Sequence, residues 1–447
     1  MAKDLTTGNV FRTLTVFAVP LFLSNLFQTV YNLTDMLIVG RFVGKTALSA
    51  VSVGSDLLHL LLFFAVGFSS AGQVMIGQYV GSGHKEKLDR AIGTLLVVME
   101  STALALALLC FFLRRQALNW LNAPAQSYED AVTYVVVCLF GLVFTYGYNS
   151  ICAILRGLGD SFHPFLIIVI TTVINLALDL LFVAVFRWGV LGAALATIFG
   201  QAMSFLLAFF FLVRQRHTFG ISLRPAQSAP QVEILSPLLR LGIPMTIQSI
   251  SVNLSMLLVS SWINSYGVDV VSISGIGNKV MNVVTLQTNA VYTAGSAMVA
   301  QCLGAKKYKR VPGIIASSAL INYSIAILAS LLVYLFPQEI FRMFLPELEG
   351  SALIAAYIPS LIVSFLAGAS RCSVMSLVNG SGNARLNLLI AILDGIVTRI
   401  GLSAFLGFGL SMGYQGFWMG GAIAGFIPFF IGGLFFLSGK WKTGSCT

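Results

Sequence analysis

Long apolar runs alternate with short polar segments along the whole chain. About 20 apolar residues in a helix span the hydrocarbon core of a bilayer, so each run predicts one transmembrane helix. The expected helices cover residues 13–40, 47–80, 91–113, 131–155, 163–186, 190–213, 238–264, 272–303, 314–336, 352–380, 385–408 and 412–437. The pattern therefore predicts an all-α membrane protein with twelve transmembrane helices.

The second half of the chain repeats the first. Three blocks match at a common shift of about 223 residues, and a shift of 224 places Pro20 on Pro244. The blocks are GKTALSAVSVG (44–54) with GVDVVSISGIG (267–277), GQVMIGQYVG (72–81) with GSAMVAQCLG (295–304), and LRGLGD (155–160) with VNGSGN (378–383). Such a repeat predicts two pseudo-symmetric six-helix bundles of the same orientation, as in transporters with parallel repeats.

The longest polar stretch between apolar runs lies at the midpoint of the chain. It contains three prolines and charges of both signs, which is typical of a linker. We expect an amino-terminal lobe over 1–213, a cytoplasmic linker over 214–237 and a carboxy-terminal lobe over 238–447.

Composition and charge agree with a membrane location. Only 9% of the residues are charged and 57% are hydrophobic, whereas about a quarter of the residues of soluble domains are charged. The net charge of +10 comes from Lys and Arg clusters between the apolar runs, which argues against nucleic acid as a partner. On the side that holds both termini lie 17 of these residues, against 6 on the other, so the positive-inside rule predicts cytoplasmic termini.

An acidic residue lies well inside the first apolar run. Asp35 sits within PLFLSNLFQTVYNLTDMLIVGRFVG (20–44), where an aspartate costs roughly 2.5–3.5 kcal/mol and marks a functional site by default. Gln28 and Tyr31 share its helix face through the i, i+3, i+7 spacing. We expect this face to line a solvent-filled cavity.

The fifth expected helix presents a second acid. Asp179 follows Asn175 by four residues, so the two side chains share one face of an apolar helix. Two neighbouring carboxylates in a low-dielectric cavity can take up and release a proton or a sodium ion. The alternative is a structural role in which Asn175 and backbone groups cap Asp179.

The two halves of the repeat differ in charge. At the common shift, Asp35 aligns with Leu258 or Val259. Asp179 aligns with Leu402. The acids of the first half therefore have no acidic counterparts in the second.

Further ionisable residues in or near the expected helices are Asp56, Glu100, Asp394 and Arg399. For each, a cavity-lining role and a structural ion pair or interfacial position both remain open. Asp394 and Arg399 are five positions apart, about 140° around an α-helix, so we expect that they do not pair simply with each other.

Five motifs follow one another along the first half. They are YNLTDMLIVGRFVG, IGQYVGSGHKEKL, LRGLGDSFHPF, INLALDLLFV and GAALATIFGQ. In this order, and with the repeat, the chain resembles the multidrug and toxic compound extrusion (MATE) transporters from end to end, closest to their bacterial DinF-like branch. The resemblance implies two helical lobes that export cationic and amphipathic compounds, driven by protons or sodium ions. It also implies a polar pocket in the first lobe formed by Gln28, Tyr31, Asp35, Tyr134, Asn149, Asn175, Asp179 and Thr197.

The chain departs from some members of that family in its second half. Those members carry coupling carboxylates on the seventh and tenth helices. Here the seventh has Gln248 and Asn253, and the tenth has Arg371. We therefore do not expect a cation site of that type in the second lobe.

The expected function is a secondary antiporter of a bacterial inner membrane that exports organic cations or amphiphiles. Sodium, as the coupling ion, would be held by Asp35, Asp179 and Asn175. No cofactor is expected, and the expected partners are the small-molecule substrate and membrane lipid, with the chain acting as a monomer. GRFVGKT (40–46) has three residues between its glycines where a phosphate-binding loop needs four, so an ion gradient has to drive transport.

Two other functions are compatible with a polytopic membrane protein, and the sequence favours neither. A flippase for lipid-linked saccharides needs a strongly basic cavity, and only Lys279, Arg371 and Arg399 lie within the expected helices. An intramembrane enzyme is not expected either, since the sequence has no HExxH motif and GLSMG (409–413) lacks the strand that a nucleophile elbow requires.

Overall fold

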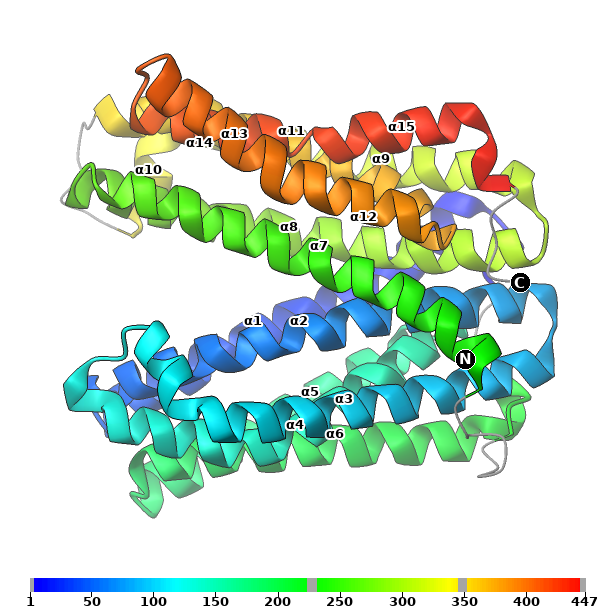
Figure 1. Cartoon of the computed structure of the whole chain (residues 1–447), viewed down its shortest axis with the longest axis horizontal. Coiled ribbons are helices and arrows are strands. Elements are labelled where there is room, and N and C mark those ends of the chain that lie inside the picture. Colours follow the sequence, from blue (N-terminus) through cyan, green and yellow to red (C-terminus); the bar gives the residue numbers. More distant parts are fainter. Residues whose placement is uncertain (1–3, 223–230, 345–351, 443–447) are drawn as a thin grey trace. The chain divides into compact units, whose positions relative to one another are not determined.

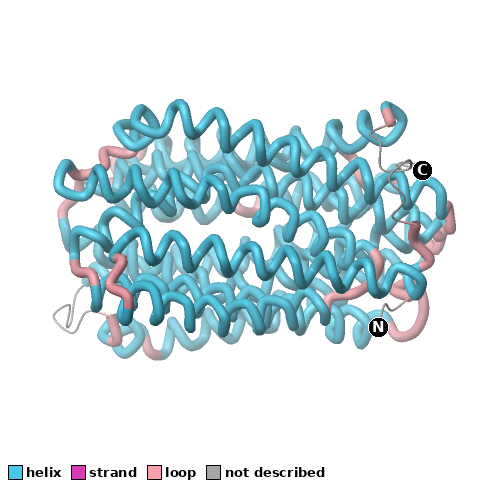
Figure 2. The backbone as a smooth tube through the Cα atoms, turned by 90° about the horizontal axis from the view of Figure 1, so that it is seen from below, coloured by secondary structure: helices cyan, strands magenta, loops and turns pink. Residues whose placement is uncertain are grey.

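The computed structural model describes residues 4–222, 231–344 and 352–442. Nearly all of these residues are helical and none lies in a strand, and Figure 2 shows the helices joined by short loops. A helix satisfies its own backbone N–H and C=O groups, which a bilayer cannot do. The predicted all-α membrane fold is confirmed.

The helices follow the predicted apolar runs and extend beyond them. They are α1 (Val10–Phe42), α2 (Lys45–Ser82), α3 (Lys85–Trp120), α4 (Tyr128–Gly157), α5 (Phe162–Asp179), α6 (Gly189–Phe219), α7 (Val232–Asn264), α8 (Val268–Gly304), α9 (Val311–Leu335), α10 (Pro337–Arg342), α11 (Ala352–Gly380), α12 (Ala384–Ile392), α13 (Arg399–Ala404), α14 (Tyr414–Ala424) and α15 (Ile427–Ser438). Wider π-helical turns form η2 (Leu180–Val185), η5 (Leu393–Thr398) and η6 (Phe405–Gly409).

Eleven helical segments of the described chain are long and apolar enough to cross a membrane. The remaining predicted helix, 272–303, is present as α8, which is 37 residues long. It is not among the eleven, because polar residues interrupt its apolar run in NKVMNVVTLQTN (278–289). The chain is thus a multi-pass membrane protein.

Only part of the predicted linker, 214–237, can be compared with the structure. Residues 223–230 lie outside the described residues. On either side of them, α6 continues to Phe219 and α7 begins at Val232, so most of the described part of this stretch is helical.

The chain forms two compact units. The first unit contains Leu23–Gly242, and the second contains Leu5–Phe22 together with the chain from Ile243 on. Helix α1 therefore begins in the second unit and ends in the first, whereas the repeat alone assigns all of it to the amino-terminal lobe.

Contacts of the amino-terminal segment explain this division. The backbone N–H of Leu5 donates to Oε1 of Gln301 at 3.2 Å, and Nζ of Lys307 donates to Oγ1 of Thr6 at 2.8 Å. Leu14, Phe17 and Leu21 are buried in the same hydrophobic cluster as residues of α8, α9 and α11. The first turns of α1 thus belong to the core of the second unit.

The two units share one packing scheme. In the first, α4 packs against α2, α3 and α6, and Figure 1 shows these helices, coloured from blue to green, running lengthwise together. In the second, α11 packs against α8, α9, α14 and α15. Because α11 follows α4 by the length of the repeat, the same helix of each half forms the centre of its unit.

Glycine contacts repeat between the units. A Cβ on Gly157 would lie 2.7 Å from Ile76, and one on Gly380 would lie 2.7 Å from Val299. Each residue of the second pair follows its counterpart by 223 positions. The glycines allow two backbones to approach closely at the same place in each unit.

The shift of the repeat increases by one residue further along. Gly192 faces the carbonyl of Phe182, whereas its counterpart Gly416 faces the backbone of Leu406, and these pairs are related by 224 positions. In this register Asp179 corresponds to Ser403 and not to Leu402. The expected absence of an acidic counterpart is unchanged.

Helix α14 contains the sequence Gly416-x-x-x-Gly420, a spacing that favours close helix contact. A Cβ on Gly420 would lie 2.6 Å from the backbone nitrogen of Ser403, whereas one on Gly421 would lie 4.0 Å from the nearest neighbour, Oγ of the same serine. We predict that Gly420→Ala costs about 1–3 kcal/mol of stability through overpacking against backbone that cannot rotate away. Gly421→Ala is the matched control.

Thermal unfolding of the two purified variants in the same detergent tests this prediction. The expected result is a clearly lower unfolding temperature for Gly420→Ala than for Gly421→Ala. Equal unfolding temperatures would contradict the close approach of α13 and α14.

Candidate functional site

Two acids approach each other in the first unit. Asp35 lies near the end of α1 and is partly buried, while Asp179 ends α5 at the junction with η2 and is 1% exposed. The two carboxylates interact electrostatically. The Oδ1 atom of each is buried without a hydrogen-bond partner in the described part of the chain. Two carboxylates with open acceptor positions at bilayer depth require a proton, a cation or water.

Tyrosine and threonine side chains surround these acids. Tyr31, one helical turn before Asp35, interacts electrostatically with both carboxylates and lies beside the side chain of Thr197. Tyr134 of α4 interacts with Asp35, and its hydroxyl group is 3.3 Å from Oγ of Ser55. The structure thus brings together Asp35, Asp179, Tyr31, Tyr134 and Thr197 from α1, α4, α5 and α6.

Asn175 supports the site from the preceding turn of α5. Its side-chain amide donates to the carbonyl of Ala196 at 3.0 Å, which ties α5 to α6. Its Oδ1 atom is buried and unpartnered. Gly200 permits this contact, since a Cβ there would lie 3.1 Å from the amide nitrogen of Asn175.

Two residues of the predicted pocket have different surroundings. Gln28 is exposed, and Asn149 donates to the carbonyl of Thr145 in its own helix at 2.8 Å. Neither shares a hydrogen bond with Asp35 or Asp179 in the described ranges. Their part in binding stays a prediction.

Three buried atoms of Asp35, Asp179 and Asn175 have no hydrogen-bond partner among the described residues, and all three are oxygens. They are Oδ1 of Asp35, Oδ1 of Asp179 and Oδ1 of Asn175. Oxygen ligands suit a hard cation such as sodium, and the two carboxylates could equally accept protons. Among the described residues there is no group of three or more His, Cys, Asp and Glu side chains that could hold a metal ion.

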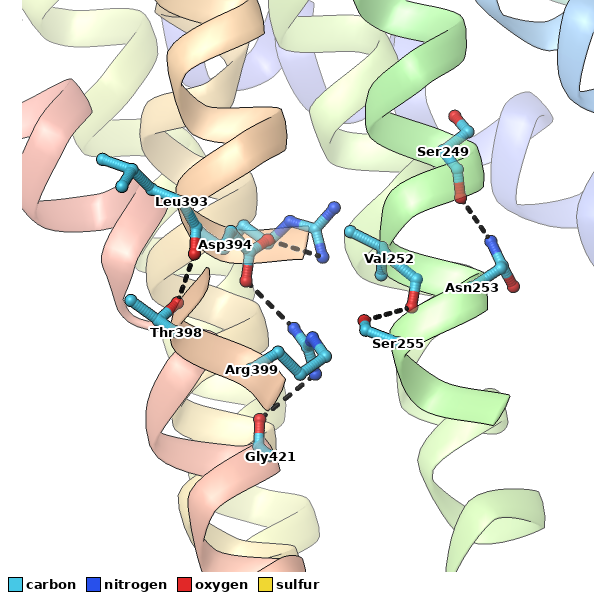
Figure 3. Close-up of polar contacts among 10 residues, drawn as sticks. Ser249, Val252, Asn253, Ser255, Leu393, Asp394, Thr398, Arg399 and Gly421 are labelled. Carbon is cyan, nitrogen blue, oxygen red and sulfur yellow. Dashed lines mark hydrogen bonds and ion pairs between the residues drawn. The ribbon is translucent and has the colours of Figure 1, made fainter. Parts of the chain in front are cut away.

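A second charged cluster lies in the second unit. Asp394 of η5 is fully buried, and its Oδ1 accepts a hydrogen bond from Nη2 of Arg399 at 3.1 Å (Figure 3). Arg399 also donates to the carbonyl of Gly421 at 3.1 Å. On the other side of the acid, Nη1 of Arg371 is 3.9 Å from Oδ2. One carboxylate is thus shared by two guanidinium groups.

The expectation that Asp394 and Arg399 do not pair was wrong. It assumed an α-helix, in which residues five apart lie about 140° from each other. The segment between them is the π-helical η5, whose i to i+5 hydrogen bonding places them on one face. The same five-residue spacing occurs in a second contact. The hydroxyl of Thr398 donates to the carbonyl of Leu393 at 2.6 Å (Figure 3).

The extra residue of the second half explains this segment. The shift of the repeat grows from 223 at Gly380 to 224 at Leu406, and η5 lies between these positions. The corresponding part of α5 is regular α-helix. In the 224 register Arg399 occupies the position of Asn175, and both bond a carbonyl of the next transmembrane segment.

The seventh and tenth predicted spans, 238–264 and 352–380, carry no acid, and α7 has only Glu233 in its first turn, before the seventh of these spans. Gln248 of α7 is buried, with its amide nitrogen unpartnered, and Asn253 donates to Ser249 in its own helix at 2.8 Å (Figure 3). The charged residue of α11 is Arg371, whose Nη1 lies 3.9 Å from Oδ2 of Asp394. The charge of the second unit is therefore reversed relative to that of the first.

Comparison with known proteins decides the family. A family model described as MatE matches the chain twice, over residues 20–181 and 244–405, which together make up more than half of its length. The chain belongs to the MatE family of multidrug and toxic compound extrusion transporters. The two matches coincide with the two copies of the internal repeat. Membership in this family makes the chain a transporter and not an enzyme.

Relatives from Bacillus subtilis (strain 168) agree with the MatE assignment. The chain is 32% identical to "Probable multidrug resistance protein YoeA" over 347 residues, which cover 76% of this chain and 75% of that protein. It is 28% identical to "Probable multidrug resistance protein YpnP" over 449 residues, covering 99% of this chain and 98% of the other. The crystal structure of a MATE protein in the bent conformation superposes with a TM-score of 0.91 at 21% identity and covers 99% of both chains. That similarity confirms the fold.

The charge cluster of the second unit makes a prediction about stability. Arg399→Gln leaves the buried carboxylate of Asp394 with only the more distant Arg371, and removing one partner of a buried ion pair typically costs roughly 3 kcal/mol or more. Arg371→Gln keeps the hydrogen-bonded pair and should cost less. Thermal unfolding of both variants in detergent measures the difference, and a larger loss for Arg371→Gln would contradict the assigned pairing.

Proposed function

We propose that the protein is a secondary antiporter that exports organic cations or amphipathic drugs in exchange for protons or sodium ions. The observation that carries the proposal is the meeting of Asp35 and Asp179, from α1 and α5, with open carboxylate oxygens inside a membrane-embedded unit. The names of the relatives, which are probable multidrug resistance proteins, support drug export. They do not favour a flippase for lipid-linked saccharides.

The exchange follows from the charge of the acid cluster. When both carboxylates are empty, their like charges repel and each attracts a cation. A proton or sodium ion that enters relieves this repulsion, so the empty and occupied states of the site differ in free energy. A bound organic cation would compete with the coupling ion for the same negative charge, which makes the two alternate.

Helix α1 offers a route from the site to the rest of the chain. Asp35 lies in the part of α1 that belongs to the first unit, while Leu5–Phe22 belongs to the second. Pro20 lies inside the helix near the division, and a proline inside a helix removes a backbone hydrogen bond and permits a bend. A change of charge at Asp35 therefore acts on a helix that both units share.

The driving force is adequate for this task. Inward movement of one positive charge gains about 2.3 kcal/mol per 100 mV of membrane potential. A tenfold ion gradient adds about 1.4 kcal/mol. For a substrate without net charge, one ion could therefore sustain a gradient on the order of a hundredfold. In one-for-one exchange with a monovalent organic cation the effect of the membrane potential cancels, and the ion gradient alone drives export.

The orientation and location complete the proposal. The protein lies in the plasma membrane of a bacterium, with both termini in the cytoplasm and the monomer as the working unit. The bias of Lys and Arg toward the side with the termini supports this orientation.

We predict that Asp35→Asn and Asp179→Asn each abolish gradient-driven export. The amide keeps the size of the side chain but cannot take up a proton or lend a negative charge to sodium. The measurement is uptake of a fluorescent cation by proteoliposomes on which a pH gradient or a sodium gradient is imposed. Asp130→Asn removes an exposed acid from the first turn of α4 and is the matched control.

The two gradients separate the coupling ions, because only the true coupling ion will drive transport by the wild-type protein. Export by Asp35→Asn and Asp179→Asn at the rate of the control would refute the role of the acid cluster.

A further inference from the structure

The first unit holds another acid inside a transmembrane helix, and the exchange at Asp35 and Asp179 does not use it. Glu100 lies in α3, which is 36 residues long, about 22 Å from the end that begins at Lys85. Both of its carboxylate oxygens are buried and have no hydrogen-bond partner in the described part of the chain. Because an unpaired charge at this depth is costly, the acid needs an explanation of its own.

Glu100 faces a glycine of the central helix α4. A Cβ on Gly147 would lie 2.6 Å from Oε1 of Glu100 and 2.5 Å from the ring of Phe205 in α6. The carboxyl group therefore occupies space that a side chain of α4 would otherwise fill, and an aromatic ring borders the same space. The acid lies in a niche formed by α3, α4 and α6.

The second unit makes the equivalent contact with different chemistry. At the shift of 223 residues, Glu100 corresponds to Tyr323 of α9, and Gly147 corresponds to Ser370 of α11. The hydroxyl groups of Tyr323 and Ser370 are 2.6 Å apart, within hydrogen-bond distance. The central helix of the second unit thus supplies a partner to the polar group that faces it. In the first unit the facing group is an acid, and the partner side chain is missing.

No cation of the packed helices balances Glu100. Helix α6 has no ionisable residue before Arg214, near its far end. In α4, Arg156 donates to the side chain of a glutamine of α2 at 2.8 Å. In α2, His59 interacts with Asp56. No charged group of the described residues acts on Glu100 electrostatically.

Other ionisable side chains of α3 and α4 are directed elsewhere or lie far along the helix. The hydroxyl of Tyr146 donates to the carbonyl of Leu61 in α2 at 2.5 Å. The hydroxyl of Tyr148 donates to the carbonyl of Pro164 in α5 at 3.5 Å. The charged residues of α3 other than Glu100 lie in its first two and last two turns. The carboxyl group therefore has neither a cation nor a hydrogen-bond donor from its surroundings.

A neutral carboxyl group suits this niche better than the alternatives. An ionised carboxylate would be left uncompensated in a low-dielectric environment. A hard metal cation is held by several oxygen ligands, whereas the niche adds only a glycine and a phenyl ring to one carboxylate. A bound proton removes the charge and requires no further ligand.

We propose that Glu100 is a proton-binding site of the first unit, separate from Asp35 and Asp179, in which a neutral carboxyl group is held between α3 and α4. The proton takes the place of the partner that Ser370 supplies in the second unit. Separation of α3 from α4 would admit water and let the proton leave, so the site links protonation of the chain to the packing of its central helix.

Infrared spectroscopy tests the protonation of Glu100 directly. A neutral carboxyl group has a C=O stretching band above the amide I band, and an ionised carboxylate lacks it. The double variant Asp35→Asn with Asp179→Asn removes the signal of the other two acids, and Glu100→Gln is then added to it. We expect the band at neutral pH in the double variant and a loss of its intensity in the triple variant. Identical spectra would overturn the proposal.

Thermal unfolding in detergent gives a second readout. The folded chain retains a proton at Glu100 that the unfolded chain releases once the pH is above the ordinary range of a glutamate, so the wild type loses stability as the pH rises. Glu100→Gln keeps the size and the neutral form of the side chain and does not titrate. We expect its unfolding temperature to fall less than that of the wild type between mildly acidic and alkaline pH.

A control and a replacement variant make the two measurements specific. Glu86→Gln removes an exposed acid from the first turn of the same helix, and it should follow the wild type in both. Glu100→Met fills the niche without a polar group, and it takes the place of Glu100→Gln if the amide does not fold.

Equal pH dependence of the unfolding temperature in the wild type and in Glu100→Gln would overturn the proposal. Stabilisation by sodium ions at alkaline pH of the wild type but not of Glu100→Gln would also overturn it, in favour of a metal cation at this site. Neither measurement uses a transported compound, so failure of the proposed export function would leave both results unchanged.

Discussion

A charge inside a bilayer has to be paired, hydrated or used, and this constraint governs where the chain places its ionisable residues. The site of the first unit brings together two acids, Asp35 and Asp179, whose Oδ1 atoms have no hydrogen-bond partner among the described residues, so it attracts cations. The second unit places two arginines around one aspartate, so its cluster retains positive charge. The same helical scaffold thus carries opposite charge in its two copies.

Close helix packing is what the two copies keep in common. The central helices α4 and α11 occupy the same place in their units, and glycines such as Gly157 and Gly380 admit a neighbouring backbone at the same point of each. The second half has one additional residue in this region, and the π-helical turn η5 accommodates it. A one-residue difference between the halves therefore rearranges side chains locally and leaves the bundle intact.

The sequence predicted the parts of the structure that depend on local pattern. Apolar runs located the helices, and the repeat located the two copies, since both signals extend over many residues. It also selected Asp35 and Asp179, because an acid in an apolar helix is conspicuous. It could not predict the pairing of Asp394 with Arg399, which depends on a π-helical turn that no composition signal marks. Nor could it show that the first turns of α1 pack into the second unit, because that contact is made by ordinary apolar residues such as Leu14 and Phe17.

The division of α1 has a consequence for biosynthesis. The ribosome makes Leu5–Phe22 before the surfaces of α8, α9 and α11 that bury this segment, which follow hundreds of residues later in the chain. Until the second half has been synthesised and inserted, the packing face of this segment has to be covered by lipid or by the insertion machinery. A protein that looks like a tandem duplication therefore cannot be cut at its midpoint into two self-sufficient halves, since the later half would lack a strip of its own interior.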